Sequence, residues 1–188
     1  MTRRQSRARF IPNILSIFRV LACPLIIYFY DRGTPGAMWA GLILFIAGSL
    51  SDMLDGKIAR AYKVESRLGR IIDPIADKLL VLSALYALFA MDMIFLWLLV
   101  GIMLRDVLVT VLRLVKTKSD AVISPTVWAK GKTMYQMISL GVLLFWPIVL
   151  DVPLSSFISL PNILLYPVLL MTWATAIPYF RAFFSRRG

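Results

Sequence analysis

Six long apolar runs alternate with short polar segments along this chain. The runs cover residues 11–30, 36–54, 71–91, 93–112, 134–150 and 161–180. Each is close to the roughly 20 residues that a helix needs to cross the hydrocarbon core of a bilayer. The pattern therefore predicts an all-α integral membrane protein, built as a bundle of six transmembrane helices.

The composition supports one membrane domain over residues 1–188. The chain is 60% hydrophobic, far above a soluble domain of this length. Residues 1–9 are polar and basic, which predicts a cytoplasmic or interfacial stretch before the first helix. The first apolar run is too long for the core of a signal peptide, and no small-residue cleavage site follows it. We therefore expect no cleavable signal peptide.

The placement of positive charge predicts the orientation. The net charge is +11. The first, third and fifth connections between the apolar runs together contain one cation, Arg32. The remaining cations gather before the first run, around the second and fourth connections and at the end of the chain. By the positive-inside rule, both termini lie on the cytoplasmic side of the cell (inner) membrane. A multi-pass chain makes membrane lipids, rather than nucleic acid, the expected partners of this charge.

Four aspartates lie between Ser51 and Lys78, among apolar segments. They form two pairs, Asp52 with Asp55 and Asp73 with Asp77. The i, i+3 and i, i+4 spacings place each pair on one face of its own helix. Acidic residues inside a membrane are costly and usually functional. Two such pairs on antiparallel helices would form an oxygen-rich cage that suits a hard divalent cation such as Mg²⁺.

The other metal-binding residue types are nearly absent from the chain. It contains no histidine, and its one cysteine, Cys23, lies inside the first apolar run. An intramolecular disulfide is therefore impossible, and metal binding or proton transfer must use carboxylates. Two alternatives remain open for the acids. They could form a structural salt-bridge cluster with Arg60, Arg67 and Lys78, or the permeation site of a divalent-cation transporter, although no internal repeat of the transporter kind is visible.

The same segment resembles the signature of the CDP-alcohol phosphatidyltransferases. It reads D-x-x-D-G-x-x-A-R, then eight residues, then G-x-x-x-D-x-x-x-D. These positions are Asp52, Asp55, Gly56, Ala59, Arg60, Gly69, Asp73 and Asp77. Ile11-Pro12-Asn13, followed by Phe18-Arg19-Val20, is similar to the family's first helix. The resemblance implies transfer of a phosphatidyl group from a CDP-linked lipid to an alcohol, with release of CMP.

The resemblance also implies roles for individual residues. The four aspartates would ligate two Mg²⁺ or Mn²⁺ ions, and Asp77 would be the general base on the incoming hydroxyl. The nucleotide site would be lined by Asn13, Asp52, Gly56, Ala59, Arg60, Gly69 and Asp73. The family fold further implies a polar cavity that opens to the cytoplasm, and a homodimer.

A second group of cations lies on or beside the fourth and fifth predicted helices. Its members are Arg105, Arg113, Lys130 and Lys132. Arg105 stands inside an apolar run, and the eight-residue spacing to Arg113 puts the two close to one face. Together they could hold a phosphate on the acceptor. The alternative is that these cations only mark the cytoplasmic boundary of the membrane.

Two short stretches bear on the acceptor. RDVLVTVLR and AKGKTMYQM resemble the R-E-x-x-x-x-x-x-R and G-K-x-K-T-x-x-Q-M stretches of bacterial phosphatidylglycerophosphate synthases. Ala129 replaces the usual Gly, and Asp106 replaces the usual Glu. The resemblance implies CDP-diacylglycerol as donor and sn-glycerol 3-phosphate as acceptor. Arg-Asp at this place is also similar to the cardiolipin synthases of the superfamily, so phosphatidylglycerol remains the alternative acceptor.

Overall fold

The computed structural model describes residues 10–62, 69–116, 127–150 and 159–177. Within these ranges, the side chains at 10–13, 55–62, 69–71, 74, 112–116, 127–130 and 159–160 lie outside the description. The described residues form six helices. These are α2 (Phe10–Asp31), α3 (Pro35–Tyr62), α4 (Gly69–Ala90), α5 (Leu96–Lys116), α6 (Val127–Val149) and α7 (Ser159–Ala174).

Each predicted apolar run coincides with one of these helices, but several boundaries differ. α3 continues past the predicted end at residue 54 to Tyr62, and α6 begins at Val127 rather than at residue 134. The apolar pattern stops where charged residues begin, whereas a helix continues through Ala, Lys and Arg, which are good helix formers. The last helix is shorter than predicted, because α7 ends at Ala174 rather than at residue 180.

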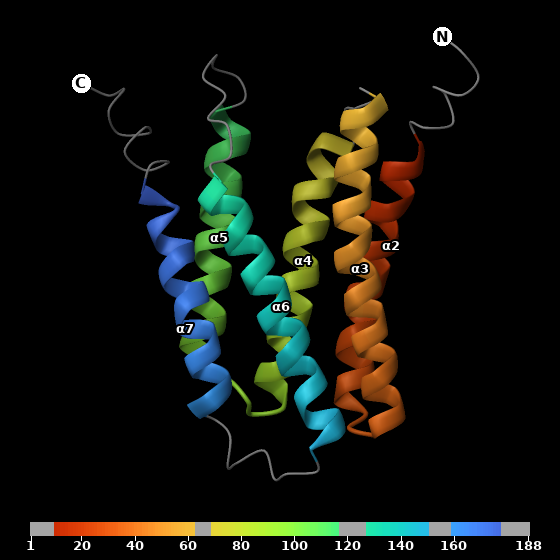
Figure 1. Ribbon diagram of the computed structural model, residues 1–188, viewed down its shortest axis with the longest axis vertical. Coiled ribbons are helices and arrows are strands. Elements are labelled where there is room, and N and C mark those ends of the chain that lie inside the picture. The colour runs from red at the N-terminus through yellow and green to blue at the C-terminus, as the bar shows by residue number, and fades with distance from the viewer. Residues whose placement is uncertain (1–9, 63–68, 117–126, 151–158, 178–188) are drawn as a thin grey trace.

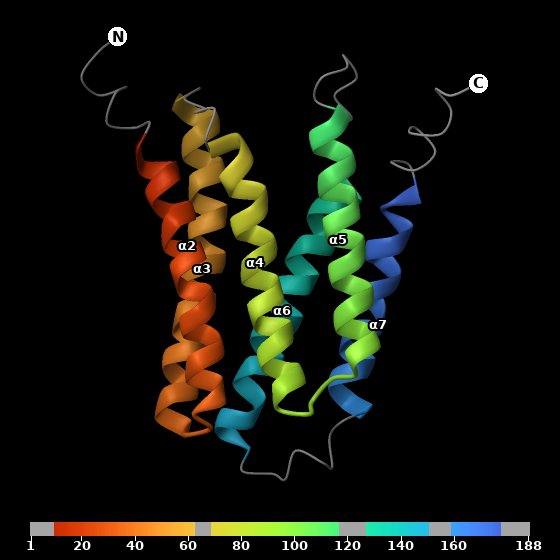
Figure 2. The same cartoon turned by 180° about the vertical axis from the view of Figure 1, so that it is seen from behind.

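The six helices run up and down in alternation (Figures 1 and 2). α2 packs against both α3 and α4, and α5 packs against α7 and α4. α6 contacts α3, α4 and α7, so it joins the two groups. In Figure 1, α2, α4 and α6 begin at the same end of the bundle, where α3, α5 and α7 finish.

Three of the helices contain segments that are long and apolar enough to cross a membrane. The segments are Ile14–Asp31, Pro35–Leu54 and Gly131–Val149, and Pro161–Ala174 is a shorter apolar helix. α4 and α5 carry charged residues within their apolar runs. The outward face of α2 is a stripe of exposed apolar side chains that includes Ile17, Leu21 and Leu25. Such exposed surface is typical of a chain in contact with lipid rather than water.

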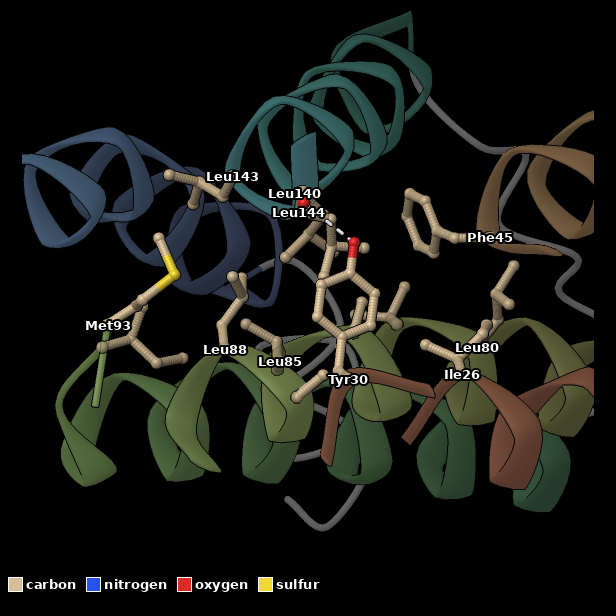
Figure 3. Close-up of a cluster of buried hydrophobic side chains, with 14 of the residues drawn as sticks. Ile26, Tyr30, Phe45, Leu80, Leu85, Leu88, Met93, Leu140, Leu143 and Leu144 are labelled. Carbon is tan, nitrogen blue, oxygen red and sulfur yellow. Dashed lines mark hydrogen bonds between the residues drawn. The ribbon is translucent and has the colours of Figure 1, made fainter. Parts of the chain in front are cut away.

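All six described helices contribute buried side chains to the apolar core, which Figure 3 shows in part. Leu80, Ala84 and Leu88 follow each other at four-residue intervals on α4 and are fully buried, as the helical period requires. Tyr30 of α2 enters this core, and its hydroxyl donates a hydrogen bond of 2.8 Å to the backbone carbonyl of Leu144 in α6. The bond gives a buried polar group the partner that it needs.

The inward faces of the helices change from mainly apolar to more polar toward one end of the bundle. Along α2, buried Ser16 and Arg19 precede buried Ala22 and Ile26 at helical spacing. Buried polar residues also occur on α3, α5 and α6, while α7 carries buried Asn162 near the other end of the bundle. The buried polar residues include Ser51 on α3, Arg105 and Asp106 on α5, and Lys132 and Gln136 on α6. By their positions along the helices, most buried polar residues lie between the middle of the bundle and the end where α2, α4 and α6 begin, and Figure 1 shows the direction of each helix.

Two tight turns close the opposite end. Gly33 lies in the turn that follows α2, and its φ of 64° is in the left-handed region that glycine adopts without steric cost. Asp92 lies in the turn that follows α4, with φ of 56°. The amide of Met93 donates to the carbonyl of Leu88 at 3.0 Å, and that of Asp92 donates to Phe89 at 2.9 Å, which is a Schellman motif.

Candidate active site

Arg19 of α2 lies between the two predicted acidic pairs. Its Nη1 is 2.7 Å from Oδ1 of Asp52 on α3, and its Nη2 is 4.0 Å from Oδ1 of Asp73 on α4. The hydroxyl of Ser16, one turn earlier on α2, donates a hydrogen bond to the same Oδ1 of Asp73. The Arg19 side chain is 0% exposed. One buried guanidinium thus brings together one aspartate from each half of the acidic segment.

The charge balance explains why Arg19 is tolerated in the bundle. A buried charge without a partner costs several kcal/mol, and a guanidinium is well suited to bind two carboxylates at once. α2 therefore supplies a permanent positive charge beside Asp52 and Asp73. The sequence resemblance includes Arg19 only as part of the first helix, and its role beside these acids was missed. The available signal was a cation near the middle of an apolar run, with Ser16 on the same helical face.

A second cluster begins one turn further along α4. Nζ of Lys78 lies 3.1 Å from Oδ2 of Asp77 and 3.6 Å from Oδ2 of Asp106 on α5. Asp106 is nearly inaccessible, with a side chain that is 4% exposed. Lys78 therefore connects the last aspartate of the acidic segment to a buried acid on another helix.

Asp106 is the centre of this second cluster. Its Oδ1 lies 2.8 Å from Nη1 of Arg105 and 3.3 Å from Nζ of Lys132 on α6. Nη2 of Arg105 also donates a hydrogen bond of 2.7 Å to the hydroxyl of Thr175, just beyond α7. The cluster thus joins α4, α5, α6 and the end of α7. Arg105 and Lys132, which are predicted from the sequence to belong to the acceptor site, thus both lie against Asp106.

The second cluster carries more positive than negative charge. Lys78, Arg105 and Lys132 contribute three cations, while Asp77 and Asp106 contribute two carboxylates. Among the described residues, Nε of Arg105 is buried and has no hydrogen-bond partner. An excess of buried positive charge with an unused donor is an arrangement that an anion would complete.

A cavity of about 320 Å³ lies between α4 and α5. Lys78 and Asp106 contribute to its wall together with Thr110, and the other lining side chains are apolar, among them Leu82, Leu85 and Ile102. The sequence resemblance implies a polar cavity. This cavity is instead mostly apolar, because α4 and α5 present their charged residues at only one part of the lining.

The fit of a divalent cation can be tested on the described carboxylates. No three acidic or cysteine side chains in the described part of the chain lie close enough to hold a metal ion. Asp55, the fourth predicted ligand, has a side chain outside the description. Oδ1 of Asp77 is buried and has no hydrogen-bond partner among the described residues. Asp52 and Asp73, which converge on Arg19, and the unused oxygen of Asp77 are hard oxygen donors of the kind that Mg²⁺ prefers.

The other predicted site residues lie in helices, but their side chains are outside the description. They are Asn13 in α2, Asp55, Gly56, Ala59 and Arg60 in α3, Gly69 in α4, Arg113 in α5 and Lys130 in α6. The alternative of a structural salt-bridge cluster is partly realised, because Lys78 does pair with Asp77. Its other two members cannot be placed, since the side chain of Arg60 and the whole of Arg67 lie outside the description.

The chain is similar to known proteins over most of its length. The family model described as CDP-alcohol phosphatidyltransferase matches residues 9–180. A protein of Rickettsia bellii named CDP-diacylglycerol–glycerol-3-phosphate 3-phosphatidyltransferase is 34% identical over 175 residues, which cover 92% of this chain and 94% of that protein. A protein of the same name from Cereibacter sphaeroides is 37% identical over 140 residues, covering 71% of this chain.

These relatives differ in length and in name. The matched region spans 62% of the length of the Cereibacter sphaeroides protein, so that relative is longer than the part it shares with this chain. A protein of Streptomyces coelicolor named cardiolipin synthase (CMP-forming) is 40% identical over 106 residues, which cover 54% of this chain and 49% of that protein. Proteins named as two different enzymes therefore resemble the chain.

Proposed function

Since this chain belongs to the CDP-alcohol phosphatidyltransferase family, we propose that it transfers the phosphatidyl group of CDP-diacylglycerol to sn-glycerol 3-phosphate. The products are phosphatidylglycerophosphate and CMP, and the protein is an enzyme of phospholipid biosynthesis. The names of the relatives from Rickettsia bellii and Cereibacter sphaeroides support this donor and this acceptor. The match to the Rickettsia bellii protein extends over nearly the whole of both chains.

The observation that supports this acceptor is the excess of cations around Asp106, because glycerol 3-phosphate carries a phosphate dianion whereas phosphatidylglycerol carries a monoanionic phosphodiester. Glycerol 3-phosphate brings a phosphate that needs fixed positive charge, and Arg105 can bind it bidentately. Arg105 and Lys132 are 8% and 5% exposed, so they are held in place and largely removed from water. Electrostatic interactions are stronger in such surroundings than in bulk solvent. We assign Arg105 and Lys132 to the acceptor phosphate, together with Arg113 and Lys130 on the same helices.

Asp52, Asp55, Asp73 and Asp77 would hold the divalent cations that this family uses, with two Mg²⁺ or Mn²⁺ ions as our proposal. When bound, the ions would withdraw charge from the pyrophosphate oxygens and stabilise the departing CMP. Arg19 holds Asp52 and Asp73 toward one another from α2. Arg60 and the close backbone approach allowed at Gly56 and Gly69 would support the nucleotide, with Asn13 and Ala59 beside it.

The phosphatidyl transfer requires one general base, which takes the proton from the hydroxyl of glycerol 3-phosphate. The acceptor's hydroxyl oxygen forms a bond to the phosphorus that carries diacylglycerol, and the bond from that phosphorus to the CMP oxygen breaks. The hydroxyl proton passes to Asp77, for which we propose the role of general base. Asp77 is suited to this role by position, because Lys78 links it to the Asp106 cluster where the acceptor's phosphate would bind.

We further propose that all six helices span the cell membrane, with both termini and the active site on the cytoplasmic side. The support is the alternation of cationic and cation-poor connections in the sequence. Most buried polar residues lie between the middle of the bundle and the end where α3 and α5 finish and α4 and α6 begin (Figure 2). In the sequence, the cation-rich connections follow α3 and α5, which agrees with this orientation. A homodimer is the assembly that the family resemblance implies.

Release of CMP from CDP-diacylglycerol by the purified protein tests the acceptor. We expect release with glycerol 3-phosphate, and little or none with phosphatidylglycerol or with water alone. A specific observation favours cardiolipin synthesis as the second candidate, because Asp106 and the Streptomyces coelicolor relative both point to it. Release with phosphatidylglycerol and none with glycerol 3-phosphate would establish that candidate and overturn our choice.

Arg105→Lys is expected to raise the KM for glycerol 3-phosphate by about tenfold. Lys keeps the charge but loses the planar fork, and one charged hydrogen bond contributes about 1.5–3 kcal/mol. The KM for CDP-diacylglycerol should stay nearly unchanged. Arg32→Lys is the matched control, since Arg32 is exposed at the far end of α2 and stacks on Tyr28. Equal changes in both KM values for Arg105→Lys would place the acceptor site elsewhere.

A further inference from the structure

Lys78 is in contact with two functional groups of the proposed site at once. Its ammonium lies 3.1 Å from the carboxylate of Asp77, the proposed base, and 3.6 Å from that of Asp106, the centre of the acceptor cluster. An ammonium has three N–H donors. The contact to Asp77 uses one, and the contact to Asp106 is longer than a normal hydrogen bond. Lys78 therefore retains donor capacity in the space between the two acids.

Access distinguishes Lys78 from the other cations of the cluster. Its side chain is 29% exposed, whereas Arg105 and Lys132 are almost completely covered. Lys78 also forms part of the wall of the cavity between α4 and α5. A small polar molecule that reaches Arg105 and Lys132 would thus meet Lys78 between that pair and Asp77. From the sequence alone, Lys78 is only a possible salt-bridge partner of the acids.

We propose that Lys78 binds the acceptor directly, through an oxygen between its phosphate and its reacting hydroxyl. The ligand class is a phosphorylated small polyol, and the inference rests on the proposed function. In this role the ammonium orients the acceptor so that the hydroxyl faces Asp77 while the phosphate stays with Arg105 and Lys132. The contrasting role, a counter-ion that only neutralises Asp77 and Asp106, would need no contact with the acceptor.

Lys78→Met tests this assignment, because Met keeps the length of the side chain and removes its charge and donors. We expect the KM and the equilibrium Kd for glycerol 3-phosphate to rise at least about tenfold, as loss of a charged hydrogen bond implies. The KM for CDP-diacylglycerol should change less than about twofold, and Lys78→Arg should recover part of the acceptor affinity. Arg32→Met, which removes one cation at the far end of α2, should leave both substrates unaffected. Unchanged acceptor affinity in Lys78→Met, or equal losses for both substrates, would overturn the assignment.

A second measurement uses the unaltered protein and does not depend on how the variants fold. Saturating glycerol 3-phosphate should slow acetylation of Lys78 by acetic anhydride, followed by mass spectrometry, whereas glycerol should not. An unchanged rate would contradict direct contact. The role of Lys78 and the proposed function can be tested separately. If wild-type protein releases CMP with glycerol 3-phosphate but Lys78 is neither protected nor needed, only the role of Lys78 fails; if it releases none, the proposed function fails.

Discussion

Asp73→Asn is expected to abolish phosphatidyl transfer, with a loss of at least about 10³-fold in the rate of CMP release. Asn keeps the shape of the side chain, and its oxygen can still accept the hydrogen bond from Ser16. The substitution removes the charge that faces Arg19 and that would bind a divalent cation. The rate should be measured beside the thermal unfolding midpoint, which we expect to change little.

The control for this experiment is Asp92→Asn, at the turn that ends α4 on the opposite side of the bundle. Asn tolerates the left-handed backbone of that position, so activity should be retained. Chelation with EDTA should inactivate the wild type, and Mg²⁺ or Mn²⁺ should restore the wild type but not Asp73→Asn. Full activity of Asp73→Asn, or full wild-type activity in the chelator, would exclude a metal-dependent role for this carboxylate.

Asp77→Asn is expected to reduce kcat by about 10²–10⁴-fold, the usual loss when a general base is removed. The affinity for CDP-diacylglycerol should remain close to that of the wild type, because Asn preserves the packing of α4. Turnover at saturating substrates and equilibrium binding of CDP-diacylglycerol are the two quantities to compare. Loss of binding in parallel with turnover would show that Asp77 acts mainly as a metal ligand rather than as the base.

The helices could be predicted from the sequence because each coincides with an apolar run. The placement of Asp52 and Asp73 beside the same side chain, Arg19, agrees with two antiparallel helices joined by a short polar connection. The ends of α3 and α6 could not be predicted in the same way, since hydrophobicity reports burial in the membrane while the helix continues beyond it.

The partners of the charged residues were much harder to predict. Spacing shows which residues share a helical face, but not which neighbouring helix that face meets. Arg19 contacts acids 33 and 54 positions away, on two different helices. Lys78 and Asp106 are likewise on separate helices, and the hydroxyl of Thr175 that binds Arg105 lies 70 positions further along the chain. These contacts depend on how α2, α4, α5 and α7 pack, which apolar patterning does not specify.

α4 is central to the proposed mechanism because it contributes residues to both charged clusters. One of its faces carries Asp73 toward Arg19, and the next turn carries Asp77 and Lys78 toward Asp106. Residues of the proposed donor site and of the proposed acceptor site thus lie on consecutive turns of α4. Their separation is fixed by helix geometry, at 1.5 Å of rise per residue, rather than by a flexible loop. Such placement on a rigid element favours the alignment that group transfer requires.

Transfer of labelled glycerol 3-phosphate from water into lipid is the most direct test of this account. The purified protein would be supplied with CDP-diacylglycerol and Mg²⁺, and both labelled lipid and CMP would be quantified. The account predicts equal amounts of CMP and labelled lipid, and neither product when EDTA replaces Mg²⁺. CMP without labelled lipid, or labelled lipid formed equally well in EDTA, would contradict it.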